Sequence, residues 1–288
     1  MALFASLATL LSAGSLMTVR LLGAGTSAAA GTSAILAALL VSTWVMTRWV
    51  NRKPFGAAGL TLHSRTLRDT GVGILVGFVM MSGIFLVEYG AGFVTVETRG
   101  VTGGEVAGLM LSSALLFALA AMVEEVLFRG YLFQTLMQAW TFVPAAAVFS
   151  LLFALAHFGN PSGGGLLPSA NIAIAGLWLS FAYLKTRSLW LPFGLHFGWN
   201  FAQSTVYSFP TSGYAMTDRH LLVIAQSGPE WITGGAFGPE GGVLATVALV
   251  LGTVAVLKSR VLAVPEGIIT LDSLEDLVPE TPSRPPTP

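Results

Sequence analysis

The sequence predicts an all-α protein, a polytopic transmembrane helix bundle with about eight membrane helices. Of its 288 residues, 54% are hydrophobic and only 10% are charged, and the mean hydropathy is +0.75, so most of the chain cannot form a water-facing surface. Apolar stretches close to the ~20 residues that cross a bilayer recur at about 2–22, 28–49, 71–93, 106–137, 143–160, 169–186, 189–208 and 241–263. These stretches are too long for strands and lack the alternation of a membrane barrel.

Basic residues predict the orientation of these helices, because cytoplasmic loops of membrane proteins carry an excess of Lys and Arg. The ends of the second and third expected helices and the loop between them hold five such residues, and two further pairs follow the sixth and eighth helices: Arg48, Arg52, Lys53, Arg65 and Arg68, then Lys185 and Arg187, then Lys258 and Arg260. The opposite side receives Arg20, Arg99 and Arg219. With eight crossings, both termini are expected in the cytoplasm, and the protein is expected in the cell (plasma) membrane.

The domain organisation follows from the same pattern. We expect one transmembrane domain over residues 1–263, with its motif-bearing core at about 106–208. The first apolar stretch lacks the positively charged start of a signal peptide, since Arg20 follows it, so it is expected to remain as a helix. Residues 264–288 are rich in proline and scattered acids and are expected to form a disordered tail.

Composition also excludes several classes of function. The chain has no cysteine, which rules out disulfides, thiolate metal sites and cysteine nucleophiles. Its formal net charge is zero and it contains no basic run, so no nucleic-acid partner is expected.

Three charged residues lie within one apolar stretch, in AAMVEEVLFRGYLF. An ionisable side chain in the membrane is costly, so it needs a partner or a function. Glu125 precedes Arg129 by four residues, which places both on one helix face in the favourable order for an ion pair. Glu124 points about 100° away from Glu125 and is expected to face a cavity, where it can act as a general base. The alternative is a single structural cluster of all three charges.

Two intramembrane histidines are the other candidate site residues. His157 ends the expected fifth helix in FALAHF, and a lone intramembrane histidine is usually an interhelical hydrogen-bond donor. In LHFGWNF, His196 and Asn200 are four residues apart and so share one helix face. Their N–H groups suit an oxyanion hole, although a structural contact between helices and metal ligation by His196 are open alternatives. Gly194 and Gly198 have the GxxxG spacing of closely packed helices.

Taken in order, EEVLFRG, FALAH and HFGWN resemble the three motifs EExxxR, FxxxH and HxxxN of the CAAX prenyl endopeptidase family, also called the CPBP or Abi family. The resemblance covers Glu124 to Asn200, about the middle quarter of the chain. It implies an intramembrane endopeptidase in which Glu124 and His157 activate a water for attack on a peptide carbonyl.

The same resemblance assigns the remaining motif residues. It implies that Glu125 pairs with Arg129 and that His196 and Asn200 stabilise the oxyanion. It also implies a peptide or membrane-protein substrate, with lipidation of that substrate left open.

Whether a metal takes part is left open by the sequence. Members of the family are commonly labelled metalloproteases, and Glu124, His157 and His196 are the candidate zinc ligands, with an open position for water. That arrangement would use the general base, unless Glu125 replaced it. We favour a site without a tightly bound metal.

Other intramembrane protease classes lack their residues in this sequence. The four aspartates, Asp69, Asp218, Asp272 and Asp276, lie outside the expected helices, so no aspartyl dyad forms. No HExxH occurs, and Ser82 in MMSGIF lacks the GxSx setting of a serine protease. Two functions outside hydrolysis remain as alternatives: a non-catalytic scaffold or bacteriocin-immunity-like protein of the same fold, and a proton-coupled transporter. The lack of an internal repeat argues against the transporter.

Overall fold

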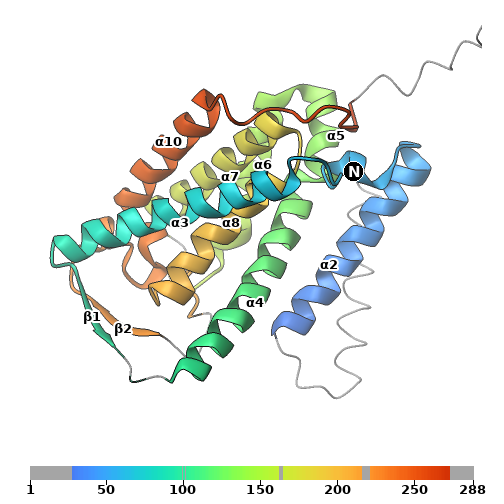
Figure 1. Ribbon diagram of the computed structural model, residues 1–288. Helices are drawn as coiled ribbons and strands as arrows, with labels where there is room; N and C mark the ends of the chain where they lie inside the picture. Colours follow the sequence, from blue (N-terminus) through green and yellow to red (C-terminus); the bar gives the residue numbers. More distant parts are fainter. Residues whose placement is uncertain (1–27, 99, 101, 162–164, 216–220, 273–288) are drawn as a thin grey trace, which may run out of the picture.

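The computed structural model describes residues 28–98, 100, 102–161, 165–215 and 221–272. This part of the chain is a helical bundle, which confirms the all-α class (Figure 1). Its longer helices are α2 (Ala28–Val45), α3 (Thr66–Gly90), α4 (Gly103–Arg129), α5 (Tyr131–Trp140), α6 (Phe142–Phe158), α7 (Leu166–Thr186), α8 (Trp190–Phe201) and α10 (Val243–Lys258). The expected helix at 2–22 lies outside the described residues, so the count of eight stays a prediction.

Length and hydropathy identify the stretches that can cross a bilayer. Among the described residues, four helical stretches are long and apolar enough: Ala28–Val50, Thr66–Gly90, Gly103–Trp140 and Leu166–Thr186. Helices α6 and α10 are shorter but also apolar. Helix α8 continues as a π-helical turn at Ala202–Val206. Together the two approach the length of a membrane helix.

The helix expected at 106–137 is not continuous. It divides at Gly130, whose ψ of −137° is not helical, into α4 and the shorter α5. A Cβ on Gly130 would lie only 2.2 Å from the carbonyl oxygen of Val126, so the break requires glycine. Helix α5 buries Phe133 and Leu136 in the core on one face.

Helices α3 and α8 lie side by side, and glycines from both form their contact (Figure 1). A Cβ on Gly77 would lie 2.3 Å from the carbonyl oxygen of Leu195, and one on Gly198 would lie 2.3 Å from that of Ile74. The main chains therefore touch directly, as GxxxG spacing predicts. The matching pair in α3, Gly73 and Gly77, was not predicted to be the partner.

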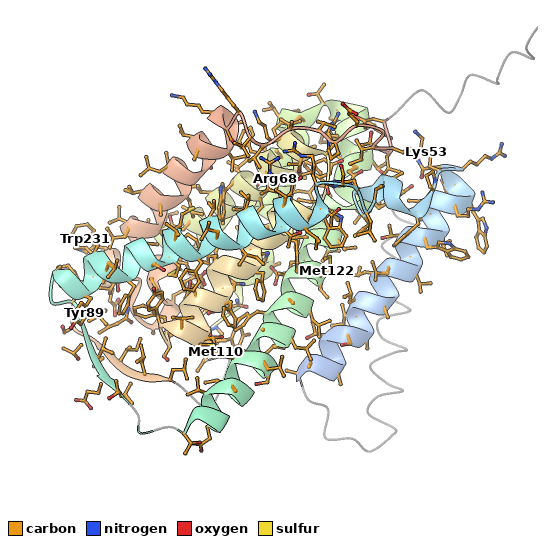
Figure 2. All side chains as sticks on the ribbon, in the orientation of Figure 1. Lys53, Arg68, Tyr89, Met110, Met122 and Trp231 are labelled. Carbon is orange, nitrogen blue, oxygen red and sulfur yellow. The ribbon has the colours of Figure 1, made fainter. Side chains whose placement is uncertain are left out.

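A two-stranded antiparallel ribbon joins the loops at one end of the bundle (Figure 1). Strand β1 (Val94–Thr98) pairs with β2 (Leu222–Gln226), with Val94 opposite Gln226. Figure 2 shows Tyr89 near this end of α3, whereas Arg68 lies at the other end of the same helix. The basic residues that predict the cytoplasmic side thus lie at the end of the bundle opposite the ribbon.

Residues 264–272, which begin the expected tail, lie against the bundle. Leu271 is buried in the core, and Arg187 binds Asp272 at 2.8 Å. Lys53 donates to the carbonyl oxygen of Thr270 at 3.1 Å. Leu271 and Ile269 pack against the core of the bundle, which composition alone does not predict. Residues 273–288 lie outside the described residues.

Candidate active site

Helix α4 carries both glutamates, and its start is fixed by its own sequence. Thr102 and Glu105 form a capping box, in which each side chain bonds the other residue's main-chain N–H, as the T-x-x-E pattern predicts. From this start the helical phase turns Glu125 into the protein interior, fully buried, and leaves Glu124 29% exposed at a cavity.

Glu125 makes the expected ion pair and one further contact. Its Oε1 lies 3.2 Å from Nη1 of Arg129 and 2.8 Å from Nδ1 of His196. Arg129 also donates to the carbonyl oxygen of Gly176 at 3.1 Å, and its guanidinium lies 4.7 Å from the centre of the Phe153 ring. The buried arginine thus contacts a carboxylate, a carbonyl and an aromatic face, while its Nε has no hydrogen-bond partner among the described residues.

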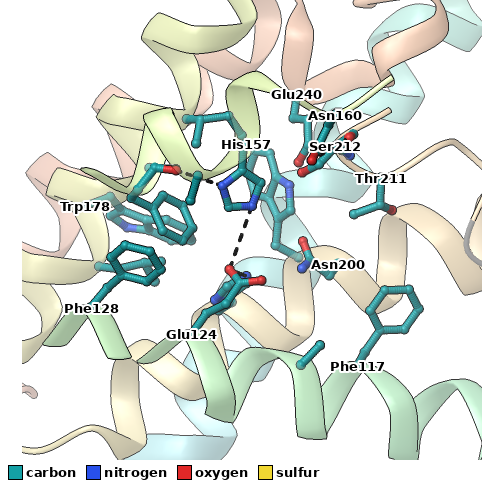
Figure 3. A pocket seen from close by; sticks show the side chains of 18 of the residues that line it. Phe117, Glu124, Phe128, His157, Asn160, Trp178, Asn200, Thr211, Ser212 and Glu240 are labelled. Carbon is teal, nitrogen blue, oxygen red and sulfur yellow. Dashed lines mark hydrogen bonds and ion pairs between the residues drawn. The ribbon is translucent and has the colours of Figure 1, made fainter. Parts of the chain in front are cut away.

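His157 is oriented by its own helix. Its Nδ1 lies 2.8 Å from the carbonyl oxygen of Phe153, one turn earlier on α6. Because a carbonyl only accepts, Nδ1 carries the proton and Nε2 is the acceptor in the neutral ring. That Nε2 lies 3.9 Å from Oε2 of Glu124 (Figure 3).

His196 is 8% exposed and lies between the two neighbouring glutamates. Its Nδ1 donates to Glu125, while its Nε2 lies 3.6 Å from Oε2 of Glu124. The sequence motif predicted neither contact. Both imidazoles therefore point Nε2 towards the same carboxylate oxygen, at separations longer than a hydrogen bond.

The cavity that these side chains line has a volume of about 390 Å³. Asn200 lines it as expected, and in the described part of the chain its carboxamide makes no hydrogen bond to another residue. Apolar side chains form much of the remaining wall, among them Phe117, Leu127, Phe128, Ile172, Trp178 and Leu249. The structure therefore brings Glu124, His157, His196 and Asn200 together at one cavity.

A second polar wall of this cavity lies outside the sequence motifs. It consists of Asn160, Thr211, Ser212 and Glu240 (Figure 3). Glu240 belongs to the 3-10 turn Pro239–Gly241 just before α10 and is only 6% exposed. Burial raises the pKa of its carboxyl. Hydrogen bonds from Ser212 and Trp199 and the electrostatic effect of the nearby His157 oppose that shift. The GPEGG context of Glu240 gives no signal that would have identified it from the sequence.

Zinc binding by Glu124, His157 and His196 stays a prediction. Among the described residues, no group of three or more His, Asp or Glu side chains is placed to hold a metal ion. Nδ1 of His157 and Nδ1 of His196 each make a hydrogen bond, which leaves both Nε2 atoms facing one carboxylate oxygen of Glu124.

Comparison with known proteins gives one match, over the segment that carries the motifs. Residues 106–202 match the family described as type II CAAX prenyl endopeptidase Rce1-like. This segment is thus similar to the CAAX prenyl endopeptidase family. No curated protein and no solved structure matches the chain. The match runs from the first turn of α4 to the end of α8, so every motif residue at the cavity lies in the matched segment, whereas Ser212 and Glu240 lie beyond it.

Proposed function

We propose that this protein is an intramembrane endopeptidase that hydrolyses a peptide bond with a water activated by Glu124. The observation that carries the proposal is the convergence of two imidazole Nε2 atoms on one Glu124 oxygen, at 3.6 and 3.9 Å, inside a largely apolar cavity. A carboxylate in such a place is suited to general base catalysis.

The orientation of His157 supports its role in water activation. Since its Nδ1 donates to Phe153, its Nε2 accepts and faces Glu124. A water bound between them would give one hydrogen to the carboxylate and one to the imidazole. Its oxygen lone pair is then directed at the substrate carbonyl, which is the orientation that attack requires.

Attack transfers one water proton to Glu124 and forms a bond between the water oxygen and the carbonyl carbon. The negative charge that develops on the carbonyl oxygen is stabilised by N–H groups of Asn200 and His196. Donation from His196 Nε2 requires a ring that carries both protons, and carboxylates flank it on both sides. Collapse breaks the C–N bond, and Glu124 returns its proton to the leaving amine.

The test is an assay of purified protein against Glu124→Gln with a fluorogenic library of membrane-tethered and farnesylated peptides, with and without a chelator. Cleavage by the wild type that is lost in the variant and unaffected by the chelator is the expected result. No cleavage of any peptide would favour the non-catalytic scaffold, and loss of activity with release of a stoichiometric metal ion would overturn the metal-free mechanism.

A further inference from the structure

The second polar wall of the cavity contains an acid that the water-activating residues do not use. The side chain of Glu240 is only 6% exposed, and it lines the same cavity as Glu124. Among the described residues, no Lys, Arg or His forms an ion pair with it. Ser212 and Trp199 donate hydrogen bonds to its carboxyl group, but burial still disfavours the charged form. A cationic group of a ligand would favour the charged form and pair with it.

Helix α7 fixes the position of the main chain around Glu240. Asn171 donates from its Nδ2 to the carbonyl oxygens of Glu240 and Gly242, at 2.9 and 2.8 Å. Thr246 in turn donates to Oδ1 of Asn171 at 2.6 Å. The carboxamide is thus fully engaged in holding the main chain around Glu240, and the side chain of Glu240 projects from a rigid base.

The loops on either side hold the carboxylate at the cavity. The main-chain N–H of Ser212 donates to Oε1 of Glu240, and Asn160 donates from its Nδ2 to the carbonyl oxygen of Ser212 at 3.0 Å. Gly238 has φ of +100°, and a Cβ there would lie 2.1 Å from the carbonyl oxygen of Pro210. These loops pack main chain against main chain and therefore leave little freedom for Glu240 to turn away.

The wall presents two acceptor groups to the cavity beside the hydroxyl group of Thr211. Asn160 uses its amide nitrogen on Ser212, which leaves its Oδ1 as an acceptor. Glu240 adds its carboxylate oxygens beside it (Figure 3). On the other side of His157 the cavity wall includes Phe128 and Trp178 (Figure 3). A ligand that fits the apolar wall and the polar wall has a long aliphatic stem and a cationic end.

From this arrangement we infer that Glu240 is a specificity-determining residue that binds the Lys or Arg side chain of a substrate peptide near the scissile bond. The inference rests on the proposed endopeptidase function and names a substrate class for it. The ammonium or guanidinium group would pair with Glu240 and Asn160, while its methylene groups contact the apolar wall.

The test uses peptides that are identical except for one position, occupied by Lys or by norleucine, moved in turn through three residues on each side of the scissile bond. At one position the wild type is expected to prefer Lys in kcat/KM by on the order of 10- to 100-fold, the range of a charge-assisted hydrogen bond. Glu240→Gln keeps an oxygen for Ser212 and removes the charge, so the Lys preference should fall to within about threefold of unity. Glu230→Gln removes an exposed acid from the same region and should keep the preference.

A binding measurement separates failure of this inference from failure of the proposed function. In the Glu124→Gln background, fluorescence anisotropy should show tighter binding of the Lys peptide than of the norleucine peptide, and adding Glu240→Gln should abolish the difference, whether or not any peptide is cleaved. Equal loss of kcat/KM for both peptides in Glu240→Gln, or an unchanged binding preference, would show that Glu240 only supports the loop and would overturn the inference.

Discussion

Nδ1 of His196 lies 2.8 Å from Oε1 of Glu125, and this bond joins α8 to α4 inside the bundle. The same oxygen lies 3.2 Å from Nη1 of Arg129. Glu125 thus holds both a buried guanidinium and an imidazole that faces the cavity. Two adjacent carboxylates have separate surroundings for this reason: Glu125 is enclosed by cations and donors, whereas Glu124 faces the cavity.

Removal of Arg129 should destabilise the protein strongly. Arg129→Ala leaves the carboxylate of Glu125 buried with only His196 as a partner, and breaking a buried pair costs about 3–5 kcal/mol. Thermal unfolding in detergent should therefore show a large fall in Tm. Arg187→Ala is the matched control, because its ion pair with Asp272 is partly exposed and such pairs contribute about 0.2–1 kcal/mol. Similar Tm values for the two variants would contradict the assignment.

Substitution of Glu124 should instead affect chemistry. Glu124→Gln keeps the shape of the side chain at the cavity but cannot take a proton from water, so turnover should fall by at least the ~10²–10⁴-fold attributed to a general base, with Tm nearly unchanged. Glu97→Gln, an exposed acid on β1, serves as the control. Turnover in Glu124→Gln equal to that of the wild type would exclude the proposed base.

Helix positions and the Glu125–Arg129 pair were predictable because they depend on local spacing. Apolar length sets where a helix crosses the bilayer, and i,i+4 spacing sets which side chains share a face. The break at Gly130 was not predictable from hydropathy, since the residues on both sides of it are apolar and only the close carbonyl of Val126 requires glycine there.

Contacts between segments far apart in the chain could not be predicted from the sequence either. The bond of His196 to Glu125 joins residues 71 positions apart, and Glu240 reaches the cavity only through the packing of two loops on Asn171. Neither arrangement leaves a periodic pattern. The depth of His157, which requires α6 to bring its last turn to Glu124 on α4, likewise depends on helix packing.

Loss of the Asn200 carboxamide should lower turnover without weakening substrate binding. A donor to the oxyanion acts only as charge develops on the carbonyl oxygen, and removal of one such donor typically costs about 10²–10³ in kcat. Steady-state kinetics of Asn200→Ala should therefore show that fall in kcat with little change in KM. A rise in KM at constant kcat would mean that Asn200 binds the substrate in its ground state.

The orientation in the membrane can be checked with reporter fusions. Lys53 contacts Thr270, and Arg187 pairs with Asp272, so these segments share one face of the bundle. Fusions after Lys53, Arg187 and Arg260 should read cytoplasmic by the positive-inside rule, and a fusion near Gly235 should read the opposite side. An external signal at Arg260 would contradict the predicted topology.

The attachment of the C-terminal segment should depend on pH. Although burial opposes it, bonding to Thr270 and the charge of Arg187 lower the pKa of Asp272 below its usual value of 3.8. A lowered pKa in the folded state stabilises the protein above pH 3.8, and this contribution disappears as the pH falls through the lowered value. The Tm difference between wild type and Asp272→Asn should be small at pH 7 and vanish once the pH is below the lowered pKa. A Tm difference that grows on acidification would contradict the lowered pKa of Asp272.

The glycine contact between α3 and α8 limits how the protein can move. Where main chains touch at Gly77 and Gly198, a shift of one helix along the other would drive backbone atoms into each other, so this pair should behave as a single rigid body. Any hinge motion that admits a peptide to Glu124 must then come from helices joined through side chains, such as α4. Spin labels on α3 and α8 should keep one fixed separation while labels on α4 report a broader distribution.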